Sequence, residues 1–139
     1  MTDHPRIFVQ IASYRDPELL ATLRDCVAGA AHPERLRFCI CWQRDTAETI
    51  GEFADDSRVR LQAVDWFDSP GLGWARSICQ QLWRGEEYTL QLDAHHRFAD
   101  GWDDTLIAMH RQVGGGRAIL STYAGSYTPG DDDAPHSRP

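Results

Sequence analysis

The chain has 139 residues, of which 42% are hydrophobic and 25% are charged, and this composition is typical of one globular domain. Its net charge of -7 argues against a nucleic-acid partner, which requires a basic face. No run approaches the roughly 20 apolar residues of a membrane span, and the N-terminus lacks a signal-peptide profile. We therefore expect a cytoplasmic location. The four cysteines lack zinc spacing and are expected to be buried thiols.

The first half of the chain alternates predicted strands with predicted helices. Ile7 to Ala12 is a near-continuous apolar run, which is typical of a strand buried on both faces. Asp16 and Pro17 suit the N-cap and first turn of a following helix. Leu36 to Gln43 predicts a second strand, and Thr46 to Ala54 predicts a weaker amphipathic helix.

The second half continues this alternation. Its apolar runs predict strands at Val59 to Asp65, Tyr88 to Asp93 and Ala118 to Tyr123. Helical spacing predicts one helix around Trp74 and another from Trp102 to Val113. Strands that alternate with helices predict an α/β fold with a mostly parallel central sheet, and we expect the first and fourth strands to be interior.

Asp93 and His95 follow the fourth predicted strand directly. Residues two apart in an extended chain project to the same side, so both can reach one cation while Ala94 points away. A carboxylate and an imidazole suit a divalent ion such as Mn²⁺. The alternative is that the two side chains cap the next helix or line a polar turn.

Polar, aromatic or charged residues follow each of the first four predicted strands: Ser13-Tyr14-Arg15-Asp16, Gln43-Arg44-Asp45, Asp65-Trp66 and Asp93-Ala94-His95. The carboxyl ends of parallel strands meet at one edge, so this pattern favours a ligand crevice. Arg76 lies in the helix opened by Gly71-Leu72-Gly73. It could face a diphosphate, pair with a carboxylate such as Asp93, or lie in solvent.

Three ordered segments resemble the GlcNAc-transferring glycosyltransferases related to the cytosolic enzyme that modifies hydroxyproline. They are Ile7 to Leu19, Gly73 to Arg76, and Leu90 to Phe98 followed by Gly101-Trp102-Asp103. The resemblance implies a GT-A fold, which is a Rossmann-like nucleotide-diphospho-sugar transferase fold. It also implies a UDP-sugar donor, UDP-GlcNAc in particular, and retaining transfer to a hydroxyl acceptor of unknown identity.

The same resemblance implies roles for individual residues. Asp93 and His95 take the place of the family's Asp-x-His metal motif, with Mn²⁺ or Mg²⁺ as the cation. Ser13, Tyr14 and Arg15 fall where the nucleotide is held, and Arg76 falls at the family's Ala-Arg position. Asp93 is thus expected both to bind the metal and to contact the nucleotide sugar, whereas no catalytic residue is assigned.

Two departures from the family pattern qualify this interpretation. Ala94 replaces the usual Ser between Asp and His, which is tolerable for a side chain that points away. Family members also continue beyond the fifth strand, so we expect residues 1–127 to be a donor-binding part and residues 128–139 a disordered tail. The acceptor half and a third metal ligand would then be missing, and His136 is a poor candidate for that ligand.

Three functions remain open at this stage. The first is a UDP-sugar-dependent glycosyltransferase, and the second is a catalytically incompetent fragment that binds the nucleotide sugar. The third is another α/β nucleotide enzyme such as a nucleotidyltransferase, although no Gly-rich phosphate loop follows the first strand. An uncovered apolar surface left by truncation would favour self-association.

Overall fold

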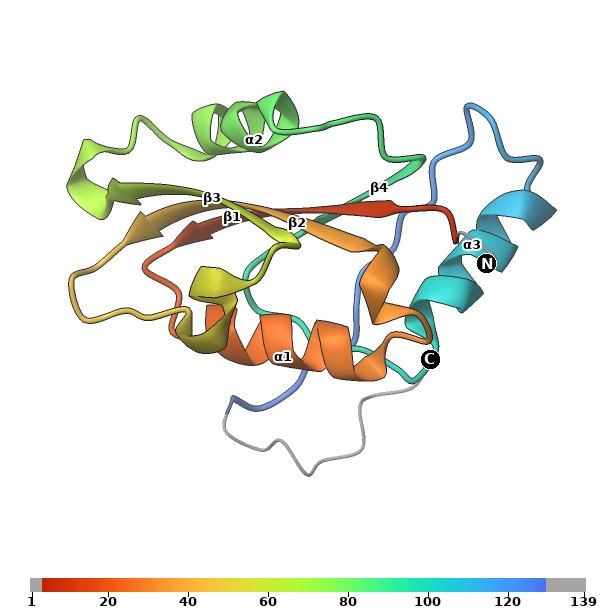
Figure 1. Ribbon diagram of the computed structural model, residues 1–139, viewed down its shortest axis with the longest axis horizontal. Coiled ribbons are helices and arrows are strands. Elements are labelled where there is room, and N and C mark those ends of the chain that lie inside the picture. Colours follow the sequence, from red (N-terminus) through yellow and green to blue (C-terminus); the bar gives the residue numbers. More distant parts are fainter. Residues whose placement is uncertain (1–3, 130–139) are drawn as a thin grey trace.

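The computed structural model describes residues 4–129, which form a four-stranded parallel sheet flanked by helices (Figure 1). The strands are β1 (Ile7–Tyr14), β2 (Leu36–Arg44), β3 (Val59–Asp65) and β4 (Tyr88–Leu92), in the spatial order β3-β2-β1-β4. β1 pairs with β2 from Ile7 opposite Leu36, and with β4 from Ile7 opposite Tyr88. All four carboxyl ends therefore lie at one edge of the sheet.

Helices cover both faces of the sheet, as an all-parallel sheet requires. α2 (Leu72–Gln81) lies on one face, and α1 (Leu19–Gly29) and α3 (Trp102–Gln112) lie on the other (Figure 1). Three short 3₁₀ helices complete the described elements: η1 (Pro33–Arg35), η2 (Gly51–Asp55) and η3 (Trp66–Asp68). The predicted α/β class and the predicted strand–helix alternation are confirmed for these elements.

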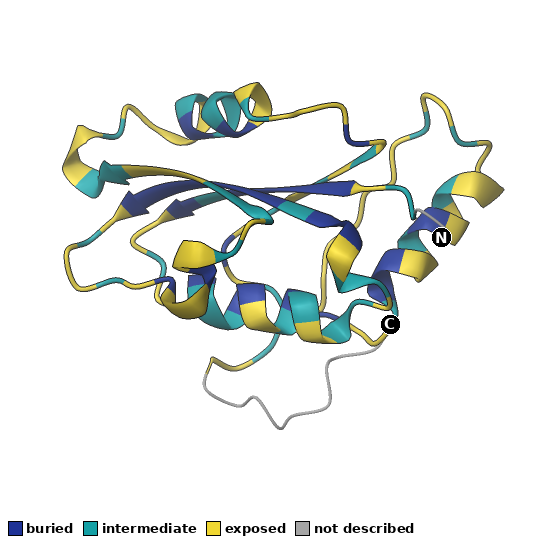
Figure 2. Cartoon of the chain, in the orientation of Figure 1, coloured by how far each residue is buried: buried dark blue, intermediate teal, exposed yellow. Residues whose placement is uncertain are grey.

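The sheet separates two hydrophobic cores, and its two central strands, β1 and β2, are the most deeply buried elements (Figure 2). The larger core lies under α1 and α3 and contains Val9, Ile11, Leu23, Phe38 and Trp102, among others. The smaller core lies under α2 and consists of Phe8, Cys39, Cys41, Ala75 and Cys79. Trp102 is 6% exposed and packs on Phe98 with ring centroids 5.0 Å apart, as a core residue does.

All four cysteines are free and buried, which confirms the sequence-based prediction. Burial raises the pKa of the Cys26 thiol, and it raises that of Cys41 to about 11. The Cys39 thiol donates to the Cys79 carbonyl at 3.1 Å. All four cysteines are small members of the two cores, and the raised pKa makes the Cys26 and Cys41 thiols poor nucleophiles.

One strand prediction was wrong in part, and another was wrong entirely. Tyr88 to Asp93 was expected to be interior, but β4 ends at Leu92 and is an edge strand of the sheet formed by residues 4–129. Ala118 to Tyr123 was expected to be a fifth strand, but it forms neither strand nor helix, and Ile119 and Tyr123 are exposed. An apolar run becomes a strand only when its N–H and C=O groups find a partner strand.

The predicted helix from Thr46 to Ala54 was also wrong over most of its length. Only η2 is helical there, and it begins at Gly51, whose φ is +50°. Side chains take the backbone donors just before it: the Glu48 carboxylate accepts from the Asp45 N–H at 2.6 Å, and Thr49 accepts from Gly51 at 3.0 Å. Such local bonds compete with the α-helical pattern.

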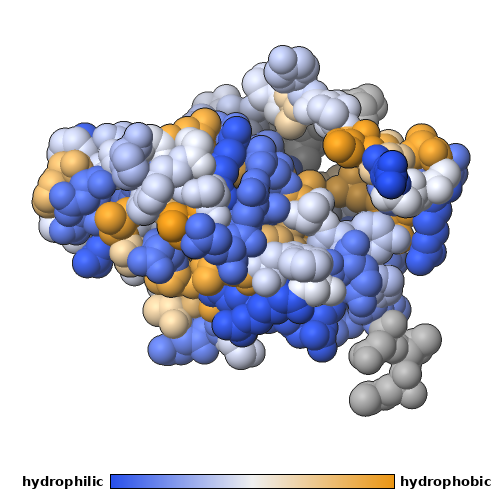
Figure 3. Space-filling model, turned by 90° about the horizontal axis from the view of Figure 1, so that it is seen from above, coloured by the Kyte–Doolittle hydropathy of each residue, from blue (hydrophilic) through white to orange (hydrophobic). Residues whose placement is uncertain are grey.

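The surface over α2 shows small groups of hydrophobic side chains separated by hydrophilic ones (Figure 3). None of the helices within residues 4–129 is both long and apolar enough to cross a membrane. The predicted disordered tail, residues 128–139, lies almost entirely outside the described part of the chain.

Candidate functional site

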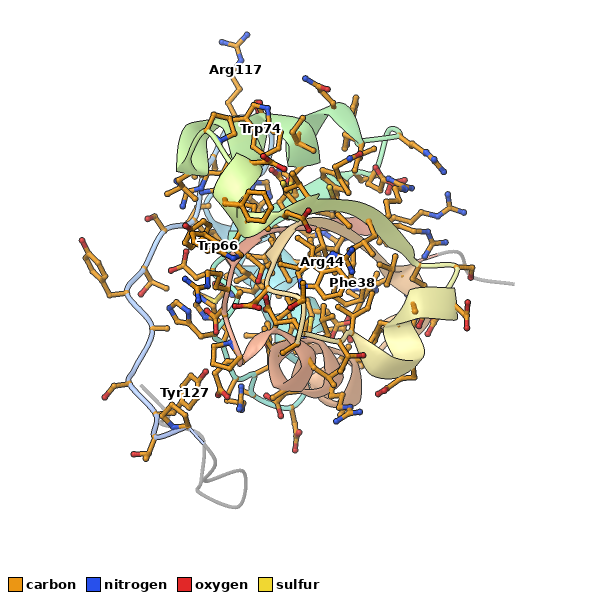
Figure 4. The ribbon with its side chains drawn as sticks, turned by 90° about the vertical axis from the view of Figure 1, so that its left-hand side faces the viewer. Phe38, Arg44, Trp66, Trp74, Arg117 and Tyr127 are labelled. Carbon is orange, nitrogen blue, oxygen red and sulfur yellow. The ribbon has the colours of Figure 1, made fainter. Side chains whose placement is uncertain are left out.

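Figure 4 views the molecule from the side on which the strands end, with Arg44 and Trp66 facing the viewer. Arg44 ends β2, and Trp66 follows β3 directly and begins η3. Charged and aromatic side chains from separate strands are thus gathered at one edge, where α/β sheets bind ligands. The sequence-based prediction placed the candidate site at this edge.

The turn after β4 turns Asp93 and His95 toward each other. The Asp93 Oδ2 and His95 Nε2 atoms are 3.9 Å apart, and both side chains are more than half exposed. Ala94, between them, is buried in the larger core. The alternation expected of an extended chain is therefore preserved around Asp93, Ala94 and His95, although β4 has already ended.

Thr22 of α1 fixes this turn from below. Its hydroxyl donates to the Ala94 carbonyl at 2.8 Å and accepts from the His96 N–H at 3.0 Å. Thr22 is fully buried, so water does not compete for these two bonds. The backbone of the turn is thereby anchored to the helix that follows β1.

Asp16 contacts His95 from the loop between β1 and α1. Its Oδ2 atom lies 2.7 Å from His95 Nδ1, and its Oδ1 atom accepts from the Glu18 N–H at 2.9 Å. A proton on Nδ1 that bonds Asp16 leaves the Nε2 lone pair directed toward Asp93. The sequence placed Asp16 at a helix N-cap and in the polar segment that follows the first strand. Nothing in the sequence linked it to a histidine 79 residues away.

The side chains of the neighbouring residues His95 and His96 do not point in opposite directions, as they would in an extended chain. In an extended chain His96 would point away from His95, but the two rings are nearly parallel, with centroids 6.1 Å apart and an interplanar angle of 3°. The chain has left the extended conformation after β4, so the two side chains no longer alternate. Burial, with His95 as a further cause, lowers the pKa of His96 and favours its neutral form.

The end of β1 supplies side chains with different exposures. Ser13 is fully buried, its Oγ atom has no hydrogen-bond partner among the described residues, and its carbonyl accepts from Gln43 Nε2 at 3.0 Å. Tyr14, in contrast, is half exposed and meets the Trp66 ring edge to face at 6.4 Å. Ser13 thus lies beneath the surface, while Tyr14 lies on it.

Arg15 turns its guanidinium toward an aromatic ring. Its Cζ atom lies 4.3 Å from the centre of the Trp66 ring, and its Nη2 atom lies 3.2 Å from Asp45 Oδ2. The backbone φ of Arg15 is +48°, a left-handed conformation that an L-residue adopts at a cost. The main-chain turn at Arg15 therefore sets where this cation lies.

Arg76 lies in the second turn of α2 and is partly buried. It forms no hydrogen bond or ion pair within residues 4–129, so the predicted alternative of a pair with Asp93 is not what the structure shows. α2 begins near the ends of the strands (Figure 1), so its first N–H groups lie toward that edge, where a helix N-terminus favours an anion.

Two metal-capable side chains converge at this edge, and within the described residues no third one joins Asp93 and His95 there. A cation bound between them would retain positions for water or for oxygen atoms of a ligand. That arrangement suits a hard or borderline divalent ion that also binds phosphate.

A family model described as Glycosyltransferase (GlcNAc) matches the chain in two segments, residues 6–56 and 51–138. The chain belongs to this GlcNAc glycosyltransferase family. Membership makes it a transferase and implies a nucleotide-sugar donor and an acceptor. No curated protein was found to match. The segments that match include all four strands and all the side chains described above.

Proposed function

We propose that the carboxyl edge of the sheet binds a UDP-sugar, UDP-GlcNAc by the family resemblance, together with Mn²⁺ or Mg²⁺, for transfer to a hydroxyl acceptor. The observation that carries this proposal is the geometry of His95. Its Nδ1 atom is held by Asp16 at 2.7 Å, and its Nε2 atom faces Asp93 Oδ2 at 3.9 Å. A histidine bonded to a carboxylate on one nitrogen is characteristic of a metal ligand.

The spacing of Asp93 and His95 fits one cation. Metal–oxygen and metal–nitrogen bonds of about 2.0–2.2 Å place two ligands on one ion at most about 4.4 Å apart. The 3.9 Å between Asp93 Oδ2 and His95 Nε2 lies within that limit. A divalent cation there would neutralise the negative charge that develops on the departing diphosphate. Asp16 would keep the His95 ring in the orientation that this requires.

Tyr14 and Trp66 are suited to hold the nucleotide. The two rings meet edge to face, and Arg15 covers one of them at 4.3 Å, so they form a fixed aromatic surface with a cation attached. Nucleobases stack on such surfaces, and a guanidinium binds phosphate oxygens. Ser13 would support this surface from the interior of the protein, because its carbonyl accepts a hydrogen bond from Gln43 and its side chain is buried.

Arg76 would complete the diphosphate site from the other side. Its guanidinium has no anionic partner among the described residues, and the helix N-terminus beside it favours a negative group. An arginine can bind two phosphate oxygens at once, and all 14 basic residues of this chain are arginines.

A second function, donor binding without efficient transfer, is favoured by the segment that follows α3. Between Val113 and Pro129 the described chain has neither helix nor strand, and most of its side chains are exposed. Transfer requires an acceptor hydroxyl held against the anomeric carbon, and such positioning contributes several kcal/mol in enzymes. No feature of the structure favours a nucleotidyltransferase.

Calorimetric titration with UDP tests the donor site. We expect binding that requires Mn²⁺ and that is abolished in Asp93→Ala. Asp55→Ala is the matched control, because Asp55 is an exposed carboxylate in η2 and is not one of the side chains of the proposed site. Unchanged Mn²⁺-dependent affinity in Asp93→Ala, or tighter binding of ADP than of UDP, would refute the proposal.

Turnover then separates an enzyme from a binding module. The chain is incubated with UDP-GlcNAc and Mn²⁺, with and without a hydroxyproline-containing peptide, and released UDP and glycosylated peptide are measured. Transfer to the peptide supports the enzyme. Slow hydrolysis of the donor without transfer supports a functional donor site that lacks acceptor positioning. Metal-dependent UDP binding with neither reaction supports the binding module.

A further inference from the structure

The amino-terminal end of the sheet, opposite the strand ends described above, gathers a second group of metal-capable side chains. His4, His32 and Glu34 each place one ligand atom so that the three atoms lie within 4.8 Å of one another. We propose that this group, the His4–His32–Glu34 cluster, binds a borderline transition-metal ion such as Zn²⁺. The inference does not depend on the proposed donor site.

His32 is held in place by its backbone. The Asp103 carboxylate accepts the Ala31 N–H at 2.7 Å and the His32 N–H at 3.0 Å. Pro33 follows and restricts His32 further, as a proline does to the residue before it. Asp103 is fully buried, so this anchor is shielded from water. His32 therefore presents its imidazole from a fixed main chain, as a pre-organised ligand does.

Each ring nitrogen of His32 faces a carboxylate. Nδ1 lies 3.7 Å from Glu34 Oε1, and Nε2 lies 3.4 Å from Asp104 Oδ2. The second carboxylate is itself fixed, because Asp104 Oδ1 pairs with Arg35 at 3.2 Å. One carboxylate can thus orient the ring while the other shares an ion with it, an arrangement common in zinc sites.

His4 brings the second imidazole. Its ring stacks on that of His32 with centroids 3.6 Å apart and an interplanar angle of 25°. An ion bound by both rings lies in the plane of each, so His4 would tilt away from the stack. The side chain is only partly buried and precedes β1, so this rotation meets little resistance.

The donor set indicates which ions would bind. Two imidazoles and one carboxylate suit Zn²⁺ or a similar borderline ion, with water as a fourth ligand. Asp93 with His95 offers only one imidazole and suits Mn²⁺ or Mg²⁺ beside phosphate. His4 precedes β1, and His32 and Glu34 lie in the connection between α1 and β2, so an ion in the cluster would tie these two segments together. The start of β1 lies next to α3 (Figure 1).

The test is calorimetric titration of the full chain with Zn²⁺ in the Asp93→Ala background, which removes the other candidate site. We expect one Zn²⁺ per chain, and an affinity at least about tenfold lower when His4→Ala or His32→Ala is added. His110→Gln is the matched control, since its Nε2 atom faces the Ala118 carbonyl outside the cluster. Its Zn²⁺ affinity should be unchanged.

His4→Ala decides the outcome, because loss of this partly exposed side chain leaves the core intact. Zn²⁺ affinity that is unchanged in His4→Ala would overturn the proposal. Zinc X-ray absorption supplies the second measurement: nitrogen and oxygen ligands with imidazole scattering support the cluster. A sulfur ligand would assign the ion to a cysteine and overturn it, as would equal affinity for Mn²⁺.

Discussion

At the amino-terminal end of the sheet, Asp103 is fully buried and accepts the N–H groups of Ala31 and His32, with Arg35 Nη1 3.6 Å away. At the carboxyl end, Asp93 and His95 leave more than half of their side chains in solvent, and their closest atoms are 3.9 Å apart. The first arrangement satisfies charges inside the protein. The second leaves ligand positions open, which is what a substrate site requires.

The two ends also differ in how their histidines are supported. His32 is held through its main chain by a buried carboxylate, whereas His95 is held through its ring by Asp16, with Thr22 fixing the adjacent backbone. Removing the support at the amino-terminal end should therefore cost stability. Removing it at the carboxyl end should cost metal affinity instead.

The largest effect is expected for Asp103→Ala. The substitution leaves the Ala31 and His32 N–H groups without their acceptor and Arg35, itself 4% exposed, without a buried partner. Breaking a buried pair in this way costs about 3 kcal/mol. Urea unfolding measures the change, and Asp55→Ala, at an exposed position, should stay within about 0.5 kcal/mol of the parent. A similarly small change in Asp103→Ala would show that its buried bonds add little.

A smaller effect, on binding rather than stability, is expected for Asp16→Asn. An asparagine still accepts the Glu18 N–H, so unfolding free energy should change by less than about 0.5 kcal/mol. The negative charge beside His95 Nδ1 is lost, however, and Mn²⁺ affinity measured with UDP should fall about tenfold. Full Mn²⁺ affinity would mean that Asp16 does not support a metal ligand.

The sequence predicted the fold well where local pattern and tertiary environment agree. β1 is buried on both faces by the two cores, so its apolar run was decisive. The run at Ala118 to Tyr123 also contains β-branched and aromatic residues, yet it found no partner strand in the described structure. Strand pairing depends on residues far away in the chain, and a single run does not contain that information.

In the candidate site too, local sequence located some residues and missed others. Asp93, His95, Tyr14 and Arg15 all follow directly from strand ends, and the structure brings them to the predicted edge. Their supports are remote in sequence: Thr22 lies 72 residues from Ala94. Such pairs have no local signature, because each partner also has an ordinary role in its own helix or cap. The burial of Ser13 was missed for the same reason.

The smallest effect concerns backbone strain at the carboxyl end. Arg15 has a φ of +48°, where a Cβ atom is unfavourable by about 1 kcal/mol and glycine is tolerated. Arg15→Gly and Arg15→Ala both remove the cation over Trp66 and the pair with Asp45, so those losses cancel when the two variants are compared. The glycine variant should be more stable by about 1 kcal/mol in urea unfolding. Both variants should bind UDP more weakly than the parent, since each lacks the guanidinium. An alanine variant as stable as the glycine variant would mean that the main chain relaxes once the side chain no longer contacts Trp66. The position of Arg15 would then follow from its contacts with the aromatic ring, and the backbone turn would be their consequence.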